Sequence, residues 1–127
     1  MDVDLVEGGG VKKRIVTEGK GGSPPDRSVV IVHYTGTLPN GSEFDSSRKK
    51  ERPFRFVLGA VQVIKAWDIG IASMRIGERA ILTCGPGFAY GEAGFPPVIP
   101  PNATLLFDVE LIGIENASAG SMGCSLV

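Results

Sequence analysis

Alternating runs of β-prone residues dominate this sequence, and only one segment has helical spacing. From Val29 to Tyr34 six β-prone residues follow one another, which predicts a strand. Helical spacing appears where Ile64, Trp67 and Ile71 fall at positions i, i+3 and i+7, which predicts one short helix over residues 65–73. Further strands are expected at Val11–Glu18 (as an exposed edge strand), Glu43–Ser47, Pro53–Gly59, Gly77–Gly85 and Thr104–Glu115.

This set of elements restricts the fold because the apolar face of a sheet must be buried against another layer. One short helix can cover five or six strands only if the sheet curls around it. The sequence therefore predicts an α+β fold, a curved five- or six-stranded antiparallel sheet wrapped around one short helix. The pair Asn40-Gly41 predicts a hairpin turn between two of the strands, since both residues tolerate positive φ.

The chain of 127 residues is long enough for one domain with its own core. We expect this domain at residues 11–115. A flexible lead-in is expected over residues 1–10, which end in three glycines, and a flexible tail over residues 116–127, which are mostly small and polar. Cys124 in this tail fits a prenylation signal poorly, because Ser125 and Val127 are unsuited to their positions in it.

Composition argues against several classes of function. Thirteen basic and fourteen acidic residues give a net charge of −1, so no nucleic-acid partner is expected. The single histidine, His33, and two cysteines without CxxC spacing argue against a metal site, and no cofactor is expected. No apolar run approaches the ~20 residues of a membrane-spanning helix, and no signal peptide is recognised. The expected location is the cytoplasm, without stable membrane insertion.

Residues 87–101, GFAYGEAGFPPVIPP, combine glycines, aromatic residues and prolines with a single charge, Glu92. Proline removes a hydrogen-bond donor, and glycine favours conformations that other residues avoid, so neither a helix nor a strand is expected here. Loops are usually polar, whereas this one is apolar and stiffened by its prolines. Such a segment is suited to form the rim of a binding surface.

Three blocks of the sequence carry a family resemblance. VHYTGTLPNGSEFDSS, PFRFVLGAVQVIKAWDIGIASMRIGERA and AYGEAGFPPVIPPNATLLFDVELI together resemble the FKBP-type peptidyl-prolyl cis–trans isomerases, over roughly residues 10–115. The resemblance implies a shallow apolar pocket between sheet and helix, catalysed rotation about X–Pro bonds, and binding of the macrolides tacrolimus and rapamycin. Partners would be proline-containing peptides and proteins, with calcineurin or the TOR kinase engaged only as drug complexes.

The resemblance also assigns the pocket, which would have a tryptophan floor, aromatic walls, an apolar rim and two polar groups at its mouth. The floor would be Trp67, and the walls would be Tyr34, Phe44, Phe54 and Phe107. The rim would be Val63, Ile64, Val98 and Ile99, and the polar groups at the mouth would be Asp45 and Tyr90. The expected catalytic residues are Asp45, Tyr90, Trp67 and Phe44. Asp45 would pair with the Tyr34 hydroxyl and with Lys50 or Arg48, and the backbone N–H of Ile64 would meet a ligand carbonyl.

The chemistry of prolyl isomerisation agrees with this set of residues. Rotation about the peptide C–N bond meets a barrier of ~18–20 kcal/mol because resonance gives the bond double-bond character. The twisted amide is less dipolar than the planar one, so a dry apolar pocket favours it by withdrawing water from the ground state. No bond breaks, and the reaction therefore requires no nucleophile, metal or redox group.

Two departures from the family pattern leave alternatives open. Ala66 stands where a glycine usually precedes the helix tryptophan, and Lys50 stands where the closest members carry arginine, whose bidentate fork lysine lacks. The same pocket could then serve as a non-catalytic module for prolyl segments or macrolides. A third possibility is a structural β-domain in which Trp67 is buried and indifferent to ligand. His33, on the face opposite Tyr34, is expected to be structural.

Overall fold

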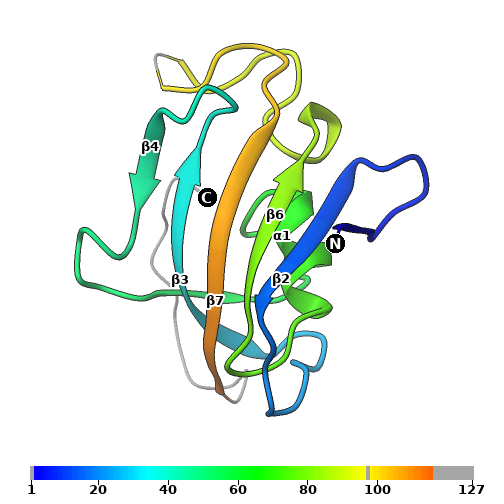
Figure 1. The fold of residues 1–127 in the computed structure, drawn as a ribbon, viewed down its shortest axis with the longest axis vertical. Helices are drawn as coiled ribbons and strands as arrows, with labels where there is room; N and C mark the ends of the chain where they lie inside the picture. Colours follow the sequence, from blue (N-terminus) through cyan, green and yellow to red (C-terminus); the bar gives the residue numbers. More distant parts are fainter. Residues whose placement is uncertain (1, 97, 116–127) are drawn as a thin grey trace.

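A single antiparallel sheet curves around one short helix in the computed structural model, which describes residues 2–96 and 98–115 (Figure 1). The strands are β1 (Asp2–Asp4), β2 (Val11–Thr17), β3 (Val29–Thr37), β4 (Glu43–Ser46), β5 (Phe54–Val57), β6 (Arg79–Cys84) and β7 (Leu105–Glu115), and the helix is α1 (Lys65–Ala72). The strand order is β1-β2-β6-β7-β3-β4, and β5 pairs with β3. This architecture confirms the predicted fold class, with one more strand than expected.

Strand β3 is the centre of the sheet. It pairs with β7 on one side, while its other side is divided between β5, which pairs with residues 29–32, and β4, which pairs with residues 35–37. Val30, Val32 and Tyr34 alternate toward the buried face, as the sequence pattern predicts. Because β4 and β5 lie end to end along β3, their aromatic side chains gather at one place on the inner face of the sheet.

Helix α1 covers that inner face. It ends at Ala72, in agreement with the predicted segment, and its buried residues are Ala66, Trp67, Gly70 and Ile71. The helix approaches β6 closely at Gly70, where an added Cβ would lie 2.6 Å from a methyl carbon of Leu82. The absence of a side chain at this position therefore allows the sheet to close around the helix.

The start of the chain differs from the expected flexible lead-in. Residues 2–4 form β1, which pairs with β2 at Lys12–Arg14, so β2 lies inside the sheet and is not the predicted edge strand. The connection turns sharply, with Gly8 and Gly9 at φ +88° and +74°. Leu5 and Val6, between strand and turn, pack against the core. The glycines that suggested flexibility thus form a turn that returns the chain to the sheet.

The predicted hairpin between β3 and β4 is present, but its turn is wider than a two-residue connection. Gly41 has φ +89°, whereas Asn40 is absent from the residues with positive φ. Asn40 instead accepts a hydrogen bond from the Ser42 N–H through its side-chain oxygen (2.8 Å), and Leu38 N–H donates to Ser42 O (2.9 Å). An Asn side chain that stabilises its own turn explains why the pair still marks the hairpin.

The remaining expectations on the chain's organisation stay predictions. The C-terminal tail, with Cys124, lies outside the described residues, and so does Pro97. The domain limits at 11 and 115 also stay predictions. Within residues 2–96 and 98–115, none of the helical segments has the length and apolar character needed to cross a bilayer.

Candidate active site

A cluster of aromatic rings fills the space between α1 and the sheet. Trp67 lies at its centre, with ring centroids 5.0 Å from Tyr34 and 5.2 Å from Phe107, both in edge-to-face geometry, which favours aromatic pairs. Phe54 and Phe56 contact the same indole at 5.9 and 5.8 Å. The structure therefore brings Trp67, Tyr34, Phe54 and Phe107 together, as predicted, and adds Phe56, which lies two residues from Phe54 on the same face of β5.

Trp67, the predicted floor of the pocket, is covered by other side chains. Trp67 has 0% of its surface exposed, and its Nε1 has no hydrogen-bond partner among the described residues. The indole is therefore the buried base of the cluster, and a ligand would reach it only through shifts of the side chains above it. Phe44 and Phe54, by contrast, are half-buried at the edge of the cluster.

The Phe44 wall depends on Gly36 in β3. A Cβ at Gly36 would lie 2.6 Å from the Phe44 ring and 2.8 Å from the Phe107 ring. The two phenylalanines meet edge to face at 5.5 Å across this glycine. Gly36 was not among the predicted site residues. A glycine within an otherwise β-prone run is the sequence signal that could have identified it.

Asp45 places a carboxylate beside these rings. Its side chain is only 7% exposed, and one oxygen accepts a hydrogen bond from the Tyr34 hydroxyl at 2.6 Å. The other oxygen lies 2.9 Å from Lys50 Nζ and accepts the Ser46 N–H at 2.9 Å. These contacts compensate the loss of water around a nearly buried charge.

Of the two cations proposed for Asp45, the structure selects Lys50. Arg48 points to the other side of the sheet edge, where its guanidinium donates to Thr35 Oγ1 at 3.0 Å and to the Asp108 carbonyl at 3.1 Å. Asp108 also holds Arg79 through two hydrogen bonds of 2.9 and 2.8 Å. Arg48 thus belongs to an ion-pair network that is separate from the aromatic cluster.

Tyr90 is close enough to Asp45 to respond to its charge. Burial is the main cause that raises the pKa of the Tyr90 phenol to about 12, and the negative charge of Asp45 contributes to the same shift. The hydroxyl consequently keeps its proton far above neutral pH. The chemistry available here is that of a neutral hydrogen-bond donor beside a carboxylate.

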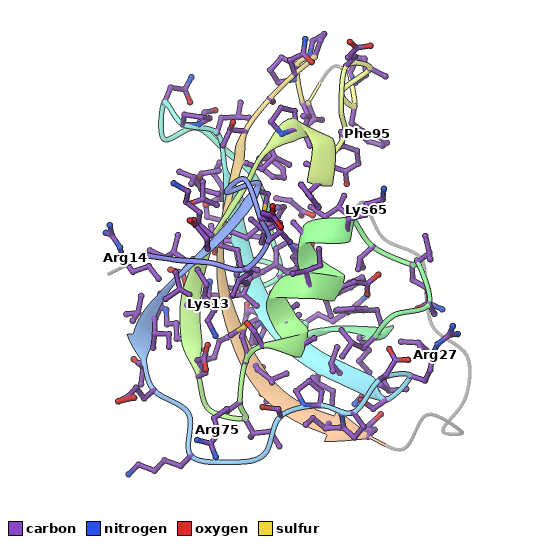
Figure 2. All side chains as sticks on the ribbon, turned by 90° about the vertical axis from the view of Figure 1, so that its right-hand side faces the viewer. Lys13, Arg14, Arg27, Lys65, Arg75 and Phe95 are labelled. Atoms are coloured by element: carbon purple, nitrogen blue, oxygen red, sulfur yellow. The ribbon has the colours of Figure 1, made fainter. Side chains whose placement is uncertain are left out.

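The loop after β6 carries Tyr90 and forms one side of the site. It begins with a short 3₁₀ turn at Pro86–Phe88, and an isolated β-bridge pairs Phe95 with Ile99, so the segment is more ordered internally than a plain loop. Figure 2 shows Phe95 above the start of α1, marked by Lys65. Phe95 and Val98 are 44% and 38% exposed, whereas Ile99 is buried in the core. Of the two predicted rim residues in this loop, only Val98 faces solvent.

The first turn of α1 contributes backbone donors to the same region. Ile64 is the N-cap residue and has no side-chain capping hydrogen bond. Its carbonyl accepts from Trp67 N–H at 3.0 Å, and its own N–H has no acceptor within the part of the chain that is described. Val63 and Ile64 are nearly buried, which places this N–H at the apolar margin of the cluster.

Other candidates have structural partners. His33 Nδ1 lies 2.8 Å from Ser47 Oγ, which also accepts the Tyr34 N–H, so His33 helps to join β3 to the segment after β4. In residues 2–96 and 98–115 no three His, Cys, Asp or Glu side chains gather in a way that could hold a metal ion. The polar groups that lie near the aromatic cluster are the Asp45 carboxylate, the Tyr90 hydroxyl and the Ile64 N–H.

Comparison with known proteins identifies the class to which this fold and site belong. The family model described as "FKBP-type peptidyl-prolyl cis-trans isomerase" matches residues 21–112. The chain is 52% identical over 107 residues to the peptidyl-prolyl cis-trans isomerase FKBP1A of Xenopus laevis, covering 84% of this chain and 99% of the relative. It is 59% identical over 103 residues to FK506-binding protein 1 of Dictyostelium discoideum, covering 81% and 96%.

A solved structure gives the same result. The N-terminal domain of FKBP42 from Arabidopsis thaliana superposes with a TM-score of 0.84 at 35% identity, covering 91% of this chain and 93% of that one. The chain belongs to the FKBP-type peptidyl-prolyl cis–trans isomerases and has their single isomerase domain. It is accordingly an enzyme that interconverts the cis and trans forms of X–Pro peptide bonds.

Proposed function

We propose that the enzyme binds X–Pro segments at the margin of the aromatic cluster, between β4, the start of α1 and the Tyr90 loop. The observation that carries this proposal is the Asp45 carboxylate, 7% exposed beside aromatic rings and tied to Tyr34 and Lys50. A charge is rarely kept in such surroundings without a function. Apolar surface for a proline ring therefore lies directly beside polar groups that can orient the amide.

The proposed mechanism uses exclusion of water and directed hydrogen bonds. Water stabilises the planar, dipolar amide, so transfer of the X–Pro bond to a site lined by Phe44 and Phe54 favours the twisted form. The Ile64 N–H and the Tyr90 hydroxyl are the donors that would hold the carbonyl groups of the substrate. The Asp45 charge helps to keep Tyr90 protonated, because it opposes ionisation of the phenol. Each ~1.4 kcal/mol removed from the barrier increases the rate tenfold.

Paired substitutions test this site. Tyr90→Phe removes one hydrogen-bond donor, and we expect kcat/KM for a Leu-Pro peptide to fall roughly two- to tenfold, as for a hydrogen bond of about 0.5–1.5 kcal/mol. Asp45→Asn should reduce kcat/KM at least as much, because it removes a charged acceptor from Tyr34.

Asp108→Asn is the matched control for Asp45→Asn. Asp108 is also an ion-paired aspartate, but it follows the buried Phe107 in β7 and faces away from the cluster. We expect it to retain the kcat/KM of the unmodified enzyme. Equal loss of kcat/KM in the two Asn variants, or none in Asp45→Asn and Tyr90→Phe, would refute the proposed site.

We further propose that this site binds the macrolides tacrolimus and rapamycin. The name of the Dictyostelium relative, FK506-binding protein 1, supports macrolide binding at a homologous site. The exposed Phe95 and Val98 would remain at the surface of a drug complex, where calcineurin or the TOR kinase could contact them. A role in protein folding and a cytoplasmic location stay predictions.

Membership of the isomerase family argues against the non-catalytic binding module that Ala66 and Lys50 left open in the sequence. Such a module would bind rapamycin and quench Trp67 fluorescence while leaving the rate of peptide isomerisation unchanged. The isomerase assay therefore tests this point directly.

A further inference from the structure

Gly10, the residue before β2, lies directly against the turn that carries Tyr90. An added Cβ at Gly10 would lie 2.4 Å from Cε2 and 2.6 Å from Cδ2 of Phe88. Gly10 is not among the glycines with positive φ, so its backbone conformation is open to other residues and only the Phe88 ring excludes a side chain. The requirement for glycine at this position is therefore steric.

A backbone contact holds the two segments in register. Gly85 N–H donates to Gly10 O at 2.8 Å and continues the β2–β6 pairing by one step past Val11 and Cys84. Gly85 is also the N-cap of the 3₁₀ turn at Pro86–Phe88. The start of the Tyr90 loop is thus held by the residue that precedes β2.

Tyr90 follows Phe88 through a compact turn with little freedom. Phe88 N–H donates to Gly85 O at 3.0 Å, and Ala89 N–H and Gly91 N–H both donate to Pro86 O, at 3.1 and 2.9 Å. The two neighbours of Tyr90 in the chain, Ala89 and Gly91, are therefore both hydrogen-bonded to Pro86. A displacement of the Phe88 ring that shifts its own backbone is therefore passed on to the segment that carries the Tyr90 phenol.

We propose that Phe88, which packs against Gly10, is a positioning residue for the isomerase reaction, because it determines where the Tyr90 hydroxyl lies relative to Asp45. The proposal rests on the role of Tyr90 put forward above. Phe88 does not contact the substrate; it acts through Tyr90. The neighbouring Gly87 supplies an internal contrast, because a Cβ there would meet nothing within 4 Å.

The test introduces one methyl group at each glycine. Gly10→Ala forces the Phe88 ring away, and we expect a loss of kcat/KM of about two- to tenfold, similar to that of Tyr90→Phe, since misplacing a catalytic group is equivalent to losing its contact. Gly87→Ala, on the same turn but in open space, should retain the unmodified kcat/KM. Circular dichroism and thermal unfolding would establish that each variant is folded.

Two double variants separate positioning from general damage. In the Tyr90→Phe background Gly10→Ala should cause no further loss, because the donor that it displaces is already absent. In the Phe88→Ala background it should also have no effect, because the atoms with which the methyl collides are gone. If Gly10→Ala lowers kcat/KM in either background by the same factor as in the unmodified enzyme, the proposal is overturned, since a merely destabilising substitution acts independently of Tyr90.

The outcomes of the single variants distinguish this inference from the proposed function. If Tyr90→Phe leaves kcat/KM unchanged, the proposed role of Tyr90 fails, and with it the basis of the inference. If Tyr90→Phe lowers kcat/KM and Gly10→Ala, correctly folded, does not, the role of Tyr90 stands and the positioning role of Phe88 is wrong.

Discussion

The surroundings of Tyr90 determine the pH range over which its hydroxyl can donate a hydrogen bond. Its pKa is raised to about 12 by burial and by the Asp45 charge, above the ordinary value of about 10. We therefore expect kcat/KM to show no decline from loss of this donor between about pH 8 and pH 10. Titration of tyrosinate absorbance in a Tyr34→Phe variant would report the Tyr90 pKa directly, and a value near 10 would contradict the assignment.

The same shift has a consequence for stability. The folded protein holds the Tyr90 proton more tightly than the unfolded chain does, so this contribution to stability is complete below about pH 10 and is lost as the pH rises toward 12. Chemical denaturation at a series of pH values should show a smaller loss of stability in this window for Tyr90→Phe. An identical pH dependence in both proteins would show that Tyr90 is not perturbed.

Cys84 is a second residue whose surroundings determine its chemistry. Burial raises the pKa of its thiol to about 12, and thiolate is the reactive form. In the native enzyme we expect iodoacetamide to leave Cys84 unmodified at neutral pH and to label it after denaturation. Peptide mapping would distinguish it from Cys124, and rapid labelling of native Cys84 would refute its burial.

Among the elements, β2 is joined by a buried ion pair to the turn between α1 and β6, and by a hydrogen bond to the end of α1. Lys13 on β2 lies 2.9 Å from Glu78, with side chains 7% and 4% exposed, and its ammonium also donates to Ser73 O at the helix C-cap. A cation at a helix C-terminus is stabilising, and Glu78 also accepts the Arg75 N–H. This contact fastens the helix to a strand that does not contribute to the aromatic cluster.

Removal of one partner should therefore be costly. Lys13→Met leaves the Glu78 charge buried without its cation, and we expect a loss of about 3–5 kcal/mol in the free energy of unfolding. The double variant Lys13→Met/Glu78→Leu should recover most of this loss. Lys49→Met, which breaks the exposed pair with Glu43, is the control and should cost less than about 1 kcal/mol. A small effect of Lys13→Met, measured by denaturant titration, would contradict the buried pairing.

Over the whole molecule, sequence patterns predicted the fold because every main strand alternates and only one segment has helical spacing. Predictions from these patterns were wrong where the position of a residue depends on partners that are distant in the sequence. Gly8 and Gly9 suggested flexibility and instead form a turn, and the strand predicted at the edge over Val11–Glu18 lies inside the sheet, where Lys13 is buried against Glu78. Periodicity contains no information about such long-range contacts.

The candidate site was predictable to a similar extent. The aromatic residues share faces that alternation reveals, but only the family resemblance assigned them to a site. The choice between Lys50 and Arg48 as the partner of Asp45 stayed open, because it depends on Asp108 holding Arg48 elsewhere. Gly36 and Gly10 acquire their importance only from the rings packed on them, which the three-dimensional structure alone discloses.

The most direct test of the account follows cis-to-trans conversion of a short Leu-Pro peptide at low temperature, with and without one equivalent of rapamycin. We expect acceleration by the enzyme, its abolition by rapamycin, and a change in Trp67 fluorescence in the same sample. Acceleration that persists at saturating rapamycin would place catalysis away from the aromatic cluster and would contradict the proposed site.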